Sequence, residues 1–277
     1  MMTFLCLMPL RAQERDNIDG NLRVKYLYFF KEDSTMQGFY ADSSMCLDVT
    51  GNETVFYSER FYLQDSAVNA APLPITVAVN LPAEFRGYCD YGRYFIDFKN
   101  NEYVKYDNAA ISRLKGHGTL EMPQWELTDR YDTICGYPCR MATAKYLGRT
   151  WGVMYTTSIP ASAGPWLLWG APGLILYAQD SEFLFVFRAF DVGQLPFDRS
   201  ENIRLLAENA YKLRPYKSIR KMEETLTRVK RSSAEDERLN GYEPSRIILK
   251  DGSTYQPQHK YIPLIPENYW EKKGRKH

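Results

Sequence analysis

Short stretches of alternating apolar and polar residues are the strongest structural signal in this chain. Arg23 to Lys31 places Val24, Tyr26, Tyr28 and Phe30 on one face, which is typical of a strand with one apolar side. Apolar runs separated by Gly- and Asn-containing turns predict two hairpins, over residues 45–61 and 94–106. Further strands are expected at Trp125–Thr128, Cys135–Tyr146 and Ser181–Phe190. The pattern therefore predicts a sheet built largely from hairpins.

The period changes near Ser200 and becomes helical. We expect a helical segment over about residues 200–231, broken near Pro215, whose second part carries an amphipathic face. Such a helix is expected to cover one side of the sheet, with attachment to a membrane surface as the alternative. The stretches 64–83 and 114–118 are expected to be connections, and a charged tail is expected over about 271–277.

The stretch from Lys145 to Asp180 is the most distinctive part of the chain. It predicts a strand at Thr150–Thr156, a turn rich in Pro, Gly and Ser, a dense apolar run and a second strand at Gly173–Ala178. The apolar run holds no side chain suited to acid–base, nucleophilic or metal chemistry.

We interpret the motif Gly170, Ala171, Pro172, Gly173, Leu174 and Ile175 as a structural corner. The glycines are expected to supply positive φ or close backbone approach. The alternative is a ligand or partner surface that uses Trp166 and Trp169.

Composition narrows the class of protein. The chain has 277 residues, of which 44% are hydrophobic and 25% charged, as in ordinary globular domains. The aromatic fraction of 14% favours strands. A net charge of +1 gives no general field for nucleic acid, and no apolar run is long enough for a transmembrane span. We therefore expect no nucleic acid partner and no membrane-spanning segment.

The first residues resemble the end of a secretory signal. An apolar run from Met1 to Leu10 precedes the Ala12-Gln13 edge, although a basic start is missing. We expect a signal-peptide remnant over 1–13 and a single domain over 14–277, exported to the periplasm or associated with the outer membrane. A buried N-terminal strand is the alternative.

Four cysteines remain after residue 13: Cys46, Cys89, Cys135 and Cys139. An even number in an oxidising compartment predicts at least one disulfide. Cys135 and Cys139 are the least suitable pair with each other, since residues four apart on a strand are separated by about 13 Å. Buried thiols and a catalytic thiol are the alternatives.

No catalytic or cofactor motif is visible. Three histidines lie far apart, and we expect no metal and no cofactor. Asp129, Asp132, Asp180 and Glu182 flank strands, as solvated turn residues do. An enzyme of hydrolase type is therefore the least favoured class.

Several short motifs, taken with their spacing, resemble the GLPGLI family of exported bacterial envelope proteins of uncharacterised function. They include Ile134-Cys135-Gly136-Tyr137-Pro138-Cys139, Leu147-Gly148-Arg149-Thr150-Trp151 and Gly170-Ala171-Pro172-Gly173-Leu174-Ile175-Leu176. The last of these has Ala171 where the family name has Leu. The resemblance implies export and a β-rich domain, and it supplies no catalytic residues.

The preferred hypothesis is a mainly β (α+β) fold. It is a curved antiparallel sheet or half-barrel with a C-terminal amphipathic helical segment. Aromatic strand faces would line a groove for a hydrophobic ligand or an envelope protein, so that the chain acts as a binding or assembly factor. A structural accessory partner of an outer-membrane complex is the second hypothesis, and it requires a flat apolar patch. The sequence leaves the oligomeric state open.

Overall fold

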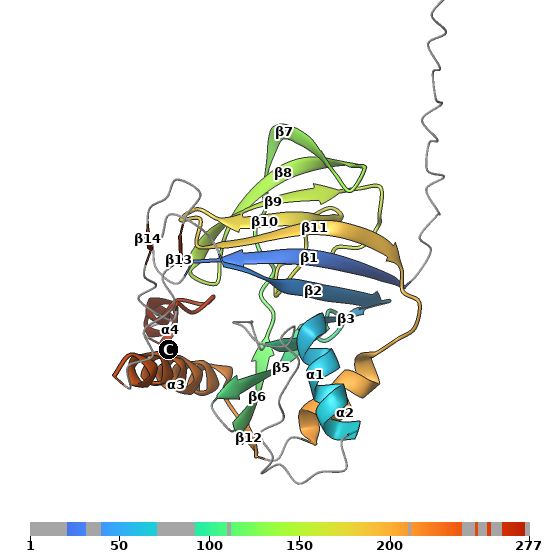
Figure 1. The fold of residues 1–277 in the computed structure, drawn as a ribbon. Helices are drawn as coiled ribbons and strands as arrows, with labels where there is room; N and C mark the ends of the chain where they lie inside the picture. The colour runs from blue at the N-terminus through green and yellow to red at the C-terminus, as the bar shows by residue number, and fades with distance from the viewer. Residues whose placement is uncertain are drawn as a thin grey trace, which may run out of the picture.

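The structure is a computed structural model that describes residues 21–31, 40–70, 92–109, 112–209, 212–239, 247–248, 254–255 and 262–274. Its frame is one open sheet of 12 strands, accompanied by helices (Figure 1). The predicted mainly β fold, with a curved antiparallel sheet and a C-terminal helical segment, is confirmed. The strands of the large sheet are β1 (Leu22–Phe30), β2 (Tyr40–Thr50), β3 (Glu53–Ser58), β4 (Arg93–Asp97), β5 (Glu102–Ala109), β6 (Ser112–Thr119), β7 (Glu126–Ile134), β8 (Tyr137–Tyr146), β9 (Arg149–Thr156), β10 (Leu174–Asp180), β11 (Phe185–Gln194) and β12 (Leu213–Tyr216).

Four helices and a small hairpin complete the described chain. They are α1 (Glu59–Ala70), α2 (Ser200–Glu208), α3 (Ile219–Leu239), α4 (Glu267–Gly274) and the pair β13 (Ile247–Ile248) and β14 (Thr254–Tyr255). Among the described residues, none of these helices has the length and apolar character needed to cross a membrane.

The sheet consists of two meanders, β1 to β6 and β7 to β11. They are joined where the first strand of the chain, β1, pairs with β11, the last strand of the second meander. The strand order is β12-β6-β5-β4-β3-β2-β1-β11-β10-β9-β8-β7, so β1 pairs with β11 at the junction. All neighbours are antiparallel except β12, which runs parallel to β6. The two predicted hairpins, over residues 45–61 and 94–106, contain the short connections from β2 to β3 and from β4 to β5.

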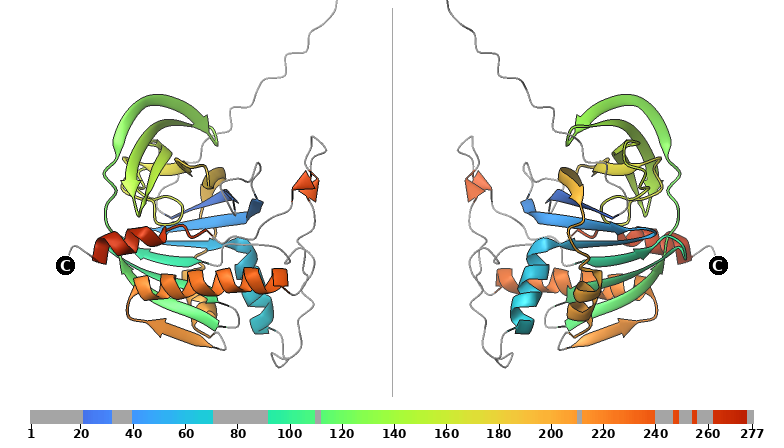
Figure 2. Two further views of the ribbon diagram at one scale, coloured as in Figure 1. Left: turned by 90° about the vertical axis from the view of Figure 1, so that its left-hand side faces the viewer. Right: turned by 90° about the vertical axis from the view of Figure 1, so that its right-hand side faces the viewer.

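The connection from β6 to β7 requires the sheet to curve strongly. These strands are ten strand spacings apart, which corresponds to about 48 Å in a flat sheet. Residues 120–125 join them, and such a link spans at most about 25 Å. The two halves of the sheet must therefore bend towards each other, as the arched β7–β8 hairpin shows in Figure 2.

The main core lies on the concave face. Alternate residues of β1 and β11, among them Tyr26, Tyr28, Phe185 and Phe187, point into one large buried cluster. The rings of Tyr28 and Phe187 stack with centroids 4.7 Å apart. Aromatic pairs of this kind add to the free energy of burial.

Helices cover only part of the sheet. On β5, Tyr106 faces a cluster that contains Ile203 of α2, whereas Lys105 at the next position donates to Glu223 of α3 at 2.8 Å. Because neighbouring strand residues point to opposite faces, α2 and α3 lie on opposite sides of this strand. The predicted helical covering of a sheet face is thus present at this end of the sheet.

Three expectations about local structure are wrong. Residues 64–70 belong to α1, which is held by Asp65 between Arg93 and Arg113. Residues 114–118 lie in β6, because Gly116 leaves room for Met222 of α3. Residues 181–184 form a turn before β11, since the Asp180 carboxylate accepts the backbone N–H groups of Leu184 and Phe185.

The segment around Pro215 and the end of the chain also differ from expectation. Leu213–Tyr216 forms β12, so Pro215 lies in an edge strand, where its missing N–H is tolerated. The charged tail predicted over 271–277 begins inside α4, which Trp270 anchors in the main core.

Candidate functional site

The apolar motif segment lies inside the concave side of the sheet, between β9 and β10. Gly170 has a φ of +76°, in the left-handed region that favours glycine. At Gly173, an added Cβ would lie 2.0 Å from the carbonyl oxygen of Thr156. Gly170 therefore has the predicted positive φ, and Gly173 has the predicted close backbone approach.

Both tryptophans of this segment are buried. Trp166 is 1% exposed and Trp169 is 7% exposed. Trp169 donates from Nε1 to the carbonyl of Glu121 at 3.2 Å, and its own carbonyl accepts from Trp125 Nε1 at 2.8 Å. This reciprocal pair ties the segment to the link between β6 and β7. In this structure neither side chain is exposed as the alternative of a binding surface requires.

The expected groove for a hydrophobic ligand is not open, because the concave side of the sheet is filled. The aromatic strand faces predicted to line it, such as Tyr26 and Phe187, belong to the same buried cluster as Trp166 and Leu168. The chain's own segment occupies the place that a hydrophobic ligand would take.

The described cysteines are all free. Cys46, Cys135 and Cys139 form no disulfide, so the predicted bridge is wrong for every pairing that involves them, and Cys89 lies outside the described residues. Cys46 packs in the outer cluster with Tyr57, whereas Cys139 belongs to the main core. The sheet therefore separates their thiols. Burial raises the pKa of Cys46 to about 12 and that of Cys139 to about 11, which disfavours catalytic thiolates.

A thiol count tests this correction. We expect at least three thiols per chain to react with a chromogenic disulfide reagent in the denatured protein without reductant. In a chain that begins near residue 14, each predicted disulfide would consume two of the four cysteines and leave at most two reactive groups.

A cleft at one end of the sheet is the candidate functional site. Its volume is about 690 Å³, within the range of roughly 300–1,000 Å³ that is usual for ligand sites. It lies where the β8–β9 turn, the β10–β11 turn, the β6–β7 link and the C-terminal segment meet. The lining residues used below are Glu121, Gln124, Lys145, Arg149, Asp180, Glu182 and Tyr269.

Arg149 organises this cleft. It donates from Nη1 to Asp180 at 3.1 Å, from Nε to the carbonyl of Leu264 at 2.9 Å and from Nη2 to the carbonyl of Pro263 at 3.0 Å. Its guanidinium also lies over the ring of Phe185, 4.7 Å from the centroid. One buried cation therefore holds the C-terminal segment by two of its main-chain carbonyls.

The charges around the cleft are close to balanced. Asp180 is 1% exposed and pairs with Arg149, so the expectation of a solvated turn residue is wrong for it. Glu121 pairs with Lys273 of α4, while Lys145 and Glu182 are exposed at the rim. This arrangement gives no excess of charge for a polyanion.

The cleft offers little for acid–base chemistry. Burial raises the pKa of Tyr146 and of Tyr269, so both phenols stay neutral near pH 7. Among the described residues, no three His, Cys, Asp or Glu side chains gather as a metal site would need.

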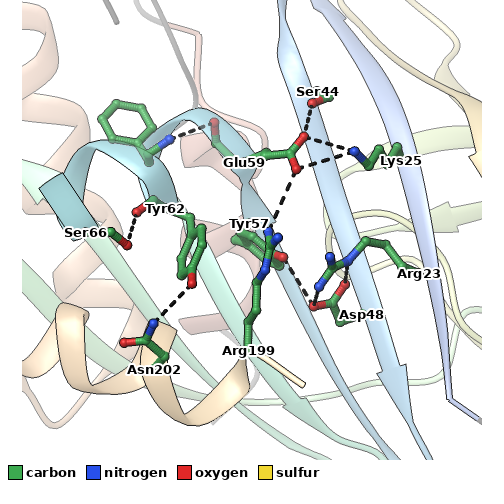
Figure 3. Close-up of polar contacts among 12 residues, drawn as sticks. Arg23, Lys25, Ser44, Asp48, Tyr57, Glu59, Tyr62, Ser66, Arg199 and Asn202 are labelled. Carbon is green, nitrogen blue, oxygen red and sulfur yellow. Dashed lines mark hydrogen bonds and ion pairs between the residues drawn. The ribbon is translucent and has the colours of Figure 1, made fainter. Parts of the chain in front are cut away.

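A second polar cluster lies on the outer face, where α1 begins (Figure 3). Arg23 donates two hydrogen bonds to Asp48, at 2.6 and 2.7 Å, and Tyr57 donates to the same carboxylate at 3.2 Å. Glu59, the first residue of α1, pairs with Lys25 at 3.3 Å. Each carboxylate has a cation beside it, and the cluster anchors the helix to the sheet.

A substitution tests the role of Arg149. In Arg149→Met we expect amide hydrogens of residues 262–274 to exchange at least tenfold faster, because the carbonyls of Pro263 and Leu264 lose their donor. Arg140→Met is the matched control, since Arg140 pairs with the exposed Asp129 on the far hairpin. Equal protection of the segment in both variants would show that Arg149 does not hold it.

Comparisons with known proteins add evidence on the fold. No family model matches this chain, and no curated protein matches it. Two solved structures of PNGF-II, in the P21 and C2 space groups, match it with a TM-score of 0.52 and 15% identity. The matches cover 76% of this chain and 34% and 33% of those chains, so this chain spans about a third of their length. At this identity the likeness shows the fold alone.

Proposed function

We propose that this protein is an exported envelope protein of the GLPGLI type, without catalytic activity, which binds a partner polypeptide as a binding or assembly factor. The partner binds at the cleft around Arg149. Residues 147–151 carry part of the family resemblance, and four of them, Leu147 to Thr150, line this cleft.

The observation that carries the proposal is the way Arg149 binds the C-terminal segment. Two successive carbonyls receive its hydrogen bonds, while Ile265 enters the core beside them. Main-chain bonds combined with an apolar anchor are how extended peptides are recognised. The cleft that remains beside this segment has balanced charge, which also suits a polypeptide.

The other function classes have less support. A carrier of a hydrophobic ligand needs an open groove, and the described concave face is filled by residues 159–173. A hydrolase needs a base with a suitable pKa beside a nucleophile, and the lining of the cleft supplies no such pair.

Site-specific crosslinking in the native host tests the proposal. A photoreactive residue at Gln124, exposed at the cleft, should give one discrete protein adduct, whereas the same residue at Lys221, exposed on α3, should give none. The additional substitution Lys145→Glu should reduce the adduct at least fivefold. Equal adducts at both positions would refute recognition at the cleft.

Export has its own test. Because the Met1–Leu10 run and the Ala12-Gln13 edge resemble a signal, we expect the mature protein to begin near residue 14. Mass spectrometry of the protein purified from an exporting host checks this, with the same gene expressed in an export-deficient strain as the control. An intact Met1 in both strains would contradict export through this segment.

A further inference from the structure

Among the described residues, no strand pairs with the outer edge of β7, which is the last strand in the order of the large sheet. Eight of its nine residues are exposed or half-exposed, so little packs on either face of the strand. Tyr131 is 68% exposed, the largest value among the exposed large hydrophobic side chains. In Figures 1 and 2 the strand forms the outermost band of the arched hairpin.

The pairing with β8 shows which backbone groups face outwards. Thr133 lies opposite Pro138, which has no N–H to donate. This pair must therefore be of the non-hydrogen-bonded kind, in which the N–H and C=O of Thr133 point away from β8. The N–H of Thr133 accordingly donates to the side chain of Asp132, at 2.7 Å. By the two-residue period, the backbone groups of Tyr131 also face the open edge.

Charges of opposite sign flank Tyr131 on this strand. Arg130 and Asp132 lie on either side of Tyr131 and are both exposed. Pairing two copies antiparallel about Tyr131 places Arg130 opposite the partner's Asp132, and Asp132 opposite the partner's Arg130. Opposite charges at facing positions stabilise a strand pair, whereas most other registers lose these contacts.

We propose that β7 is an interaction surface for a second copy of this chain, whose β7 pairs antiparallel with it about Tyr131. The two large sheets then continue into each other through a two-fold axis. The register shift leaves residues 128–130 without partners on β8, so the pairing extends no further than Arg130 and the dimer is weak. This inference is independent of the proposed function, because the lining residues of the cleft do not include β7.

A charge-swap cycle tests the register by sedimentation velocity over a range of protein concentrations. We expect Arg130→Asp and Asp132→Arg each to raise the dimer dissociation constant at least tenfold, because each places like charges opposite one another. The double variant restores the opposite pairs, and its constant should return to within about threefold of the wild-type value. A double variant as weak as the single ones would overturn the register.

Crosslinking detects the dimer even when it is weak. Facing residues of a hydrogen-bonded pair have Cα atoms about 5.5 Å apart, a separation that a disulfide spans. In a Cys135→Ser background, Tyr131→Cys should form a covalent dimer at least tenfold faster than Leu127→Cys under mild oxidation. Equal rates, or a wild-type chain that sediments as a monomer at every concentration, would overturn the proposal. Thermal melting checks that the exposed substitutions leave the fold intact.

Discussion

Gly173→Val should lower the free energy of unfolding by more than about 4 kcal/mol, and local adjustment cannot relieve the overlap, because the obstacle is backbone. An added Cβ lies 2.0 Å from the carbonyl oxygen and 2.7 Å from the carbonyl carbon of Thr156. The strand pair β9–β10 would have to separate at its first residue pair, Leu174 with Thr156. Overpacking against backbone atoms that cannot move aside is among the substitutions that destabilise a fold most.

Gly193→Val is the matched control. Gly193 lies in β11 of the same sheet, and nothing stands within 4 Å of a Cβ built there. We expect its denaturant midpoint to stay close to the wild-type value. If Gly173→Val unfolded at the same midpoint as this control, the motif would not be a packed corner.

Trp166→Ala should cost about 3–5 kcal/mol, the usual loss for a large buried aromatic side chain. Trp166 is fully enclosed, and its ring centroid lies 5.6 Å from that of Trp151. Trp169→Ala should cost a similar amount, since it also removes the donor to Glu121 and the stacking on Phe98. Urea unfolding measures both.

Phe190→Ala serves as the control for these tryptophans, because Phe190 is 48% exposed. Its loss should change the free energy of unfolding by less than about 1 kcal/mol. Tryptophan variants as stable as Phe190→Ala would return the motif to the status of a recognition loop.

The success of the strand predictions has a physical cause. On β1 and β11 the side chains alternate between a core face and a second face, and a period of two is visible in any sequence. The helix α1 was not predicted, because its residues show no amphipathic period. Its position depends on Asp65 meeting Arg93 and Arg113, which are distant in sequence. Tertiary ion pairs of this kind have no local signal.

The candidate site likewise has one part that could be predicted from the sequence and one part that could not. The need for glycine at 170 and 173 followed from the local turn, and the structure supplies a distinct reason at each position. The cleft could not be predicted, because Arg149 meets Asp180 across 31 residues and Pro263 across 114. The arginine was visible inside a motif, but its partners were defined only by the fold.

The chain's own motif segment fills the concave side of the described sheet. Titration with a fluorescent fatty-acid probe, followed by energy transfer from tryptophan, tests this claim most directly. Because the concave side is filled, we expect no saturable binding of the probe at micromolar concentrations and no quenching of the buried tryptophans. Saturable binding of one probe per chain, with quenching that is lost in Trp166→Phe, would contradict it.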